Sequence, residues 1–393
     1  MTDNKNLTKT HGIFFISTYF IMLITGLVLL TTGAILPDIV KEFDISYEMA
    51  GLLLSFQAIG NVSAVIISGF LSDFIGRKIL LVAGSLMVAV SMLGLLFVSS
   101  VTALFILIFI SGCGWGTNNV VNGAMNDVTG GSAKYLNRMH VFFAVGALTA
   151  PFIVILADNF GSGWRITGGV IGAMAVCSAV LLLFIKVPSV PKVQEKSKIR
   201  ASFEPFKHGR YYIFIAIIST YVAVETILNG WVATYFQDTG ILTNVQAKTA
   251  LSLIWAAIMA GRFTVSIIGD KVKKEYITMT CASVILLFSF ILIQLNSFIG
   301  VAVCVFALGL GLSAIFPTNL ANAASIVQGS GIATGILLSS GGFGAAVGPV
   351  VTGLVAERLN ISASMWVSVG FAVILILMAA VNCVLGKRLK NTK

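Results

Sequence analysis

The sequence predicts an all-α membrane protein whose twelve transmembrane helices form two similar bundles of six. Three observations predict this class. Of the 393 residues, 57% are apolar and 10% are charged, whereas soluble domains carry roughly 25% charged residues. The apolar residues gather in twelve stretches, and several polar and small residues of the first half recur in the second half at a near-constant offset.

Each apolar stretch is long enough to cross a bilayer, for which a helix needs about 20 residues. A mean hydropathy of +0.98 over the whole chain excludes a soluble protein with a single anchor. The first stretch is longer than the apolar core of a signal peptide, so we expect it to be retained. The predicted spans are 13–36, 48–70, 79–98, 102–124, 138–157, 166–186, 211–236, 245–268, 276–296, 299–321, 330–355 and 363–385.

The basic residues lie mostly on one side of the predicted membrane. With the N-terminus inside the cell, four of the 25 lie on the outer side and the other 21 on the cytoplasmic side. The four are Lys41, Arg165, Lys248 and Arg358. Because this asymmetry follows the positive-inside rule, the net charge of +10 reports topology and not a nucleic-acid partner. We expect a monomer in the cell inner (cytoplasmic) membrane, with both termini cytoplasmic.

One long polar segment, rich in Pro, Lys and Glu, divides the chain. We expect residues 1–186 to form an N-terminal six-helix bundle, 187–210 a cytoplasmic linker, and 211–393 a C-terminal six-helix bundle.

Features of the first bundle recur in the second at offsets of 197 to 200 residues. The pairs are Asn119 and Asn319, Asn122 and Asn322, Asp73 and Asp270, and Pro151 and Pro349. Two bundles related by duplication predict a substrate site at the membrane midplane, with alternating access by rocking of one bundle against the other.

A charged decapeptide, GFLSDFIGRK, follows the second predicted span. Its two glycines let helices approach closely, and Asp73 is placed to accept helix amides or to pair with a basic side chain. The spacing resembles the loop signature G-x-L-x-D-x-x-G-R-K of the major facilitator superfamily, which implies the two-bundle transporter fold of that family. We hypothesise that Asp73 and Arg77 form a cytoplasmic latch that favours the outward-open state. The predicted gating residues are Gly69, Asp73, Gly76, Arg77, Lys78, Arg262 and Asp270.

Glu225 is the acidic residue that the sequence places deep inside a span, about halfway along the seventh. A charge at the bilayer centre costs several kcal/mol and needs a partner, a proton or a water-filled cavity. Glu225 is therefore a candidate proton carrier or acceptor for substrate hydroxyls. The alternative is a structural, protonated glutamic acid that bonds to a neighbouring helix.

Uncharged polar residues provide the candidate substrate contacts, because amides both donate and accept hydrogen bonds without a charge. These candidates are Asn229, Asn118, Asn119, Asn122, Gln57, Asn61, Asn319 and Asn322. Bonds between helices are an equally open interpretation of these amides. Trp231 and Trp255 are candidates for stacking on a sugar ring, and an anchor at the membrane interface is the alternative for Trp231. We expect Trp164 to be an anchor only and Glu42 to belong to a solvated rim.

The second half also resembles the fucose and glucose/mannose proton-symporter branch of the superfamily. The similarity rests on the segments around Glu225, at 221–235, at 255–262 (WAAIMAGR) and at 309–318 (GLGLSAIFPT). It implies proton-coupled sugar transport. The branch tends to carry acids in the first and fourth spans, where this chain has Gly33 and either Gly116 or Asn119. The intact signature at Asp73 and Arg77 is commoner among exporters.

The favoured function is secondary active transport of a small polar organic solute, a sugar above others, coupled to protons. The alternative is a drug or metabolite efflux carrier, working as a proton antiporter or uniporter. The sequence contains no P-loop, no metal-ligand spacing and no catalytic triad, so we expect neither an enzyme nor a bound cofactor or metal. The partners that we expect are a small-molecule substrate, protons and the lipid bilayer.

Overall fold

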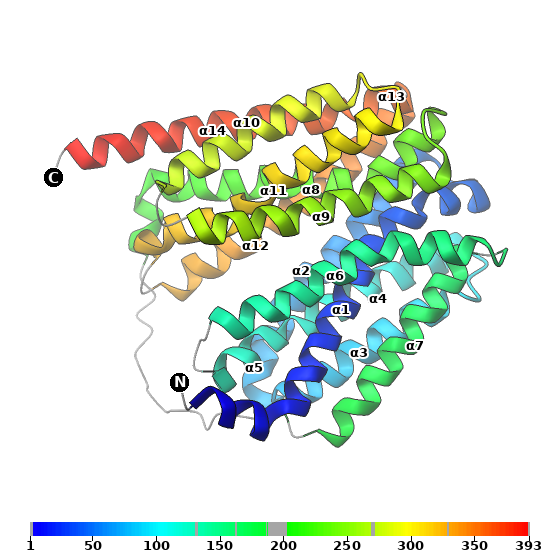
Figure 1. Ribbon diagram of the computed structural model, residues 1–393, viewed down its shortest axis with the longest axis horizontal. Helices are drawn as coiled ribbons and strands as arrows, with labels where there is room; N and C mark the ends of the chain where they lie inside the picture. The colour runs from blue at the N-terminus through cyan, green and yellow to red at the C-terminus, as the bar shows by residue number, and fades with distance from the viewer. Residues whose placement is uncertain are drawn as a thin grey trace. The chain divides into compact units, whose positions relative to one another are not determined.

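The structure is a computed structural model that is helical in nearly all of its described residues (Figure 1). It describes the backbone of residues 3–129, 133–161, 163–185, 187, 203–268, 272–327 and 330–391. The helices are α1 (Asp3–Phe43), α2 (Tyr47–Ile75), α3 (Arg77–Gly94), α4 (Val101–Asn118), α5 (Val120–Thr129), α6 (Ala133–Asp158), α7 (Gly163–Phe184), α8 (Gly209–Asp238), α9 (Asn244–Ile268), α10 (Lys274–Leu292), α11 (Phe298–Val327), α12 (Gly331–Arg358), α13 (Ile361–Ser364) and α14 (Trp366–Asn391), with a 3₁₀ helix η1 (Glu204–Lys207) before α8. The all-α prediction is confirmed.

Eleven stretches of the described helices are long and apolar enough to cross a membrane. The segment that contains α4 and α5 counts as one of them, and so does the segment that contains α13 and α14. The predicted eighth span corresponds to α9, which is not among the eleven.

The predicted fourth span is not one continuous helix. α4 ends at Asn118 and α5 begins at Val120, and the amides of Asn119 and Asn122 bond to carbonyls three residues earlier. These bonds make a tightened turn of 3₁₀ type at Asn119. The predicted fourth span is nevertheless confirmed as one apolar segment, Val101–Thr129, with this turn inside it.

The chain divides into two compact units. Unit 1 consists of Met1–Asp44 and Phe56–Gln194, and unit 2 of Ile45–Ser55 and Glu195–Lys393. The first nine residues of α2 thus group with unit 2, whereas the rest of α2 groups with unit 1. The boundaries predicted from the linker do not anticipate this exchange of a short segment.

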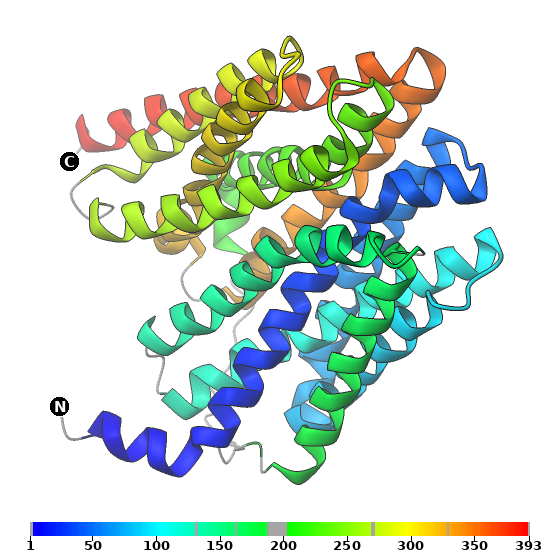
Figure 2. The same ribbon diagram turned by 45° about the vertical axis from the view of Figure 1, so that its right-hand side comes forward.

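Glycines set the helix packing inside unit 1. α1 lies along α6, as both ribbon views show (Figure 1, Figure 2). A Cβ on Gly26 of α1 would overlap the carbonyl oxygen of Phe143, and one on Gly146 of α6 would overlap that of Leu23. Gly112 of α4 is packed in the same way against the backbone of Gln57 in α2. These glycines allow direct backbone contact between helices.

Unit 2 uses the same kind of contact between the corresponding helices. A Cβ on Gly344 of α12 would overlap the carbonyl oxygen of Ser219 in α8, and one on Gly309 of α11 would overlap that of Ile254 in α9. In each unit the first span therefore packs on the fifth, and the second on the fourth. This repeated pattern is what two duplicated bundles predict.

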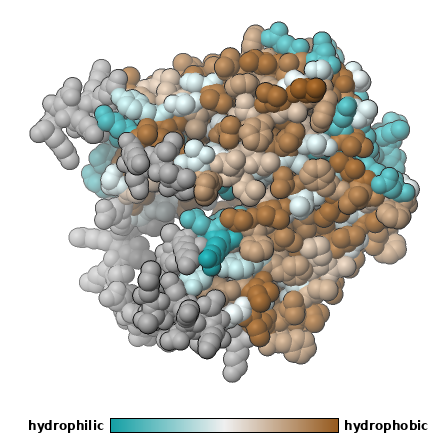
Figure 3. Space-filling view, in the orientation of Figure 1, coloured by the Kyte–Doolittle hydropathy of each residue, from teal (hydrophilic) through white to brown (hydrophobic). Residues whose placement is uncertain are grey.

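Apolar side chains cover much of the molecular surface seen in Figure 3. Large exposed apolar residues occur on many helices of both units, among them Val90, Leu183, Phe184, Ile299 and Phe343. Exposed apolar surface of this extent indicates a membrane environment, because soluble monomers rarely expose large apolar patches.

Candidate transport and gating sites

Glu225 lies in the middle of α8 and is half-buried. Its carboxylate accepts a hydrogen bond from the hydroxyl of Tyr221, one turn earlier, and the positive charge of Arg262 in α9 acts on the same carboxylate. A carboxylate within a span thus has both a donor and a nearby cation, and these are the groups that make a buried charge tolerable.

A second polar contact joins the same two helices. The indole Nε1–H of Trp255 in α9 donates to Oδ1 of Asn229 in α8 over 3.2 Å, and both side chains are buried. Trp231 is also fully buried and donates its Nε1–H to the carbonyl of Pro349 over 3.2 Å. Because Trp231 is in the interior of unit 2, the interface-anchor alternative is wrong for it. Stacking of a sugar on either tryptophan stays a prediction.

The asparagines of the fourth span do not form one cluster of contacts. Asn118 is buried beside Gly84 of α3, and its Oδ1 has no hydrogen-bond partner. Nδ2 of Asn119 donates to the carbonyl of Trp115 over 3.4 Å, and Nδ2 of Asn122 donates to the carbonyl of Asn119 over 3.1 Å. These two bonds stay within the span, so a substrate-lining role remains a prediction for all three asparagines.

Gln57 has a structural contact that its neighbour Asn61 lacks. Nε2 of Gln57 donates to Oγ of Ser111 over 3.2 Å and to the carbonyl of Val28 over 3.4 Å, and the side chain is buried. Of the two interpretations of Gln57, the structure supports the bond between helices. The buried Nδ2 of Asn61, one turn later, has no hydrogen-bond partner.

The two asparagines predicted in α11 differ in their contacts. Asn319 is fully buried, and neither its Nδ2 nor its Oδ1 makes a hydrogen bond to a described residue. The side chain of Asn322 bonds to the carboxylate of Glu275. A buried amide group without a partner costs about 1–3 kcal/mol, which makes Asn319 a strong candidate for contact with a ligand.

The basic residues of the decapeptide bind other helices of unit 1. Arg77 forms an ion pair with Asp127 of α5, and its guanidinium lies against Gly123. Nζ of Lys78 donates to the carbonyl of Leu183 near the end of α7 over 2.8 Å. The sequence analysis missed Asp127, because its partner is 50 residues away. The only available signal was the presence of an acid at the end of the fourth span.

The structure describes the glycines of the predicted gate but not the side chains of its two acids. Gly76 has φ of 82°, a backbone conformation that favours glycine, and directly precedes α3. Around Gly69 no described atom lies within 4 Å of an added Cβ, so the expected close helix approach at Gly69 is wrong. The Asp73 side chain and Asp270 lie outside the described residues. The latch between Asp73 and Arg77 therefore stays a prediction.

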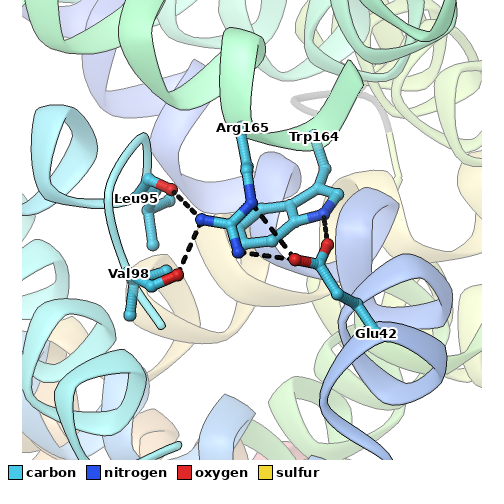
Figure 4. Close-up of polar contacts among 5 residues, drawn as sticks. All are labelled: Glu42, Leu95, Val98, Trp164 and Arg165. Carbon is cyan, nitrogen blue, oxygen red and sulfur yellow. Dashed lines mark hydrogen bonds and ion pairs between the residues drawn. The ribbon is translucent and has the colours of Figure 1, made fainter. Parts of the chain in front are cut away.

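A polar cluster that the sequence analysis missed joins three parts of unit 1 (Figure 4). Glu42, at the end of α1, accepts from Nε1 of Trp164 over 2.6 Å and pairs with Arg165 over 2.5 Å. Nη1 of Arg165 donates to the carbonyls of Leu95 and Val98, over 3.2 and 2.7 Å. Trp164 is buried, so the expectation of a membrane anchor is wrong, whereas Glu42 is bonded and still exposed, as the expected solvated rim requires.

Unit 2 contains a similar cluster around Tyr47. The backbone N–H of Tyr47 donates to Oε2 of Glu357, and its hydroxyl donates to Oδ2 of Asp238, each over 2.9 Å. The Tyr47 ring also lies 6.2 Å from the ring of Trp231, between centroids. These contacts fix the segment 45–55 on the ends of α8 and α12.

A third cluster lies at the other ends of the unit 2 helices. Arg210, at the start of α8, pairs with Glu275 of α10 over 2.6 Å, and its Nε donates to Oδ1 of Asn382 in α14 over 2.8 Å. Like the pair of Arg77 and Asp127, this cluster ties the helix ends of one unit together.

Helices of this length, the polar groups inside their spans and the glycine packing define a multi-span membrane transporter. Comparison with known families agrees, since the profile of the Major Facilitator Superfamily matches residues 18–337. The chain belongs to the Major Facilitator Superfamily. The resemblance to the fucose and glucose/mannose branch is not confirmed by these comparisons.

Several known sequences are similar to nearly the whole chain. "Protein TsgA homolog" of Buchnera aphidicola is 24% identical, with 94% of each chain covered. "Protein TsgA" of Shigella flexneri is 22% identical, with 99% of this chain and 98% of the relative covered. "Uncharacterized MFS-type transporter YfkL" of Bacillus subtilis is 23% identical, with 93% of each covered.

Two solved structures share the fold. The nucleoside transporter NupG, as its D323A mutant, has a TM-score of 0.75 at 14% identity and covers 93% of this chain and 98% of its own. A bacterial homologue of the human lysosomal transporter Spinster, in an inward-facing and occupied conformation, has a TM-score of 0.78 at 13% identity, with 96% and 97% covered. At these identities the likeness shows the fold alone.

Proposed function

We propose that this transporter moves a small polar organic solute, a sugar above others, by alternating access coupled to protons. The observation that carries the proposal is the carboxylate of Glu225 inside a span, bonded to Tyr221 and influenced by Arg262. An ionisable group at this depth marks a substrate or proton pathway by default. Buried amides with unpartnered atoms, above all Asn319, suit a ligand that offers hydroxyl groups. Both termini are proposed to face the cytoplasm.

Uptake into liposomes containing the purified protein tests this proposal. With an inward proton gradient, a radiolabelled hexose or nucleoside should accumulate above its external concentration. Nucleosides join the panel because NupG, a nucleoside transporter, shares the fold and because a nucleoside carries a ribose. Glu225→Gln should abolish the accumulation and spare exchange of substrate across the membrane.

The matched control is Glu48→Gln, which neutralises an exposed acid at the start of α2 and should leave accumulation unchanged. Unchanged accumulation in Glu225→Gln would remove Glu225 as the proton carrier. If the gradient drives drugs out of the liposomes and no polar solute in, the efflux alternative replaces the proposal.

A further inference from the structure

Arg262 is a cation in a predicted membrane span that forms no ion pair with a described carboxylate. It is half-buried in α9, and its Nε is buried and makes no hydrogen bond. None of the ion pairs formed within the described residues contains Arg262. Its charge acts on Glu225, but the carboxylate of Glu225 also holds the Tyr221 hydroxyl. When Glu225 is protonated, the charge of Arg262 has no counterion among the described residues, which is costly at such a position unless another anion reaches it.

The register of α8 and α9 aligns Arg262 with this polar group. The two helices run antiparallel from the turn at 239–243, and the bond between Trp255 and Asn229 fixes which residues face each other. Arg262 is seven residues beyond Trp255, and Tyr221 is eight residues before Asn229. Arg262 and Tyr221 therefore lie at the same depth, about 12 Å along the helices from Asn229.

We propose that the substrate is a hydroxylated organic acid, of the kind represented by a sugar acid, and that Arg262 binds its carboxylate. This inference rests on the proposed function and narrows its substrate class. A guanidinium presents a planar pair of N–H donors that matches a carboxylate in a bidentate geometry. While Glu225 is protonated, an uncharged hexose would leave the charge of Arg262 without a counterion, whereas an acid supplies one.

The same arrangement accounts for coupling. Protonation of Glu225 removes the negative charge that acts on Arg262, and the substrate carboxylate then replaces it. One proton and one monovalent anion cross together, so the transport is electroneutral. A deprotonated Glu225 instead compensates Arg262 and favours release of the acid.

Asn319 independently favours a ligand with hydroxyl groups over a simple fatty acid. Its amide is fully buried with both polar atoms unpartnered. α11 packs beside α9, where Gly261 lies against Ser313. Counted along the chain from this contact, Arg262 is one residue further in α9 and Asn319 is six residues further in α11. Free amide donor and acceptor groups recognise a hydroxyl, which both donates and accepts.

The test compares D-glucuronate with D-glucose in liposomes that contain the full chain and receive an inward proton gradient. We expect wild-type protein to accumulate glucuronate in preference to glucose, at a rate that a potassium diffusion potential does not change. Arg262→Gln should lower glucuronate uptake by roughly tenfold or more, and Arg262→Lys should retain part of it with a raised KM. The matched control Arg358→Gln, at an exposed arginine of α12, should have no effect.

Gradient-driven accumulation of glucose but not glucuronate would overturn the inference and leave the proposed function standing. Accumulation of neither compound nor of any other polar solute would overturn both. Because the wild-type preference alone decides between acid and neutral sugar, the inference stays falsifiable even if Arg262→Gln does not fold.

Discussion

At the residue scale, we propose that the bonds of the buried polar side chains separate those with structural roles from those with transport roles. Arg165 uses its guanidinium fully, since it binds Glu42 and the carbonyls of Leu95 and Val98. Arg262 and Asn319 retain unpartnered atoms. A side chain whose hydrogen-bonding groups all have partners stabilises one arrangement of helices. A side chain with unpartnered groups is, on this proposal, available to a ligand.

Arg165→Ala should therefore destabilise unit 1. It removes an ion pair and leaves two backbone carbonyls without their donor, which costs about 1–3 kcal/mol. Thermal unfolding in detergent, followed by tryptophan fluorescence, should show a lower Tm. Lys41→Ala, at an exposed position near the same end of α1, serves as the control, and an equal Tm for both variants would contradict a structural role for Arg165.

At the element scale, glycine contacts determine which helices touch. Gly112 in the fourth span, for example, lies directly against the backbone of Gln57. Spacing could not identify the partners, because a glycine is equally compatible with any helix that approaches it. The break between α4 and α5 was also missed, since no Pro marks it.

Gly344→Ala tests the packing of α12 on α8. The added methyl group would overlap the carbonyl oxygen of Ser219, and such overpacking costs about 1–3 kcal/mol. Gly370→Ala is a matched control in α14, where an added Cβ meets nothing within 4 Å. Alanine favours a helix over glycine by up to about 1 kcal/mol, so this control should keep or raise the Tm. A Gly344→Ala protein as stable as the control would refute the close contact.

At the scale of the whole molecule, the fold was predictable because a bilayer admits few solutions for the backbone. Apolar stretches of this length must be helices, and the recurrence of Asn119 as Asn319 points to two bundles. The long-range ties were not predictable. These ties join residues that are distant in sequence and meet only after the helices pack. Examples are the pair of Arg77 and Asp127 and the contacts of Tyr47 with Asp238 and Glu357.

The gating proposal also concerns the whole molecule. If Asp73 and Arg77 form a cytoplasmic latch, Asp73→Asn should slow turnover several-fold and change the substrate Kd little, because the latch biases conformations without touching substrate. Parallel measurements of exchange rate and equilibrium binding check this expectation. Weakened binding at an unchanged turnover rate would rule out the latch.

Proton movement driven by substrate tests the central claim, that Glu225 couples protons to transport. Liposomes loaded with a pH-sensitive dye and held without a proton gradient receive a substrate identified by the uptake assay. The lumen should acidify as substrate enters through wild-type protein, and its pH should stay constant with Glu225→Gln, although that variant still exchanges substrate. Acidification by Glu225→Gln at the wild-type rate would contradict the claim.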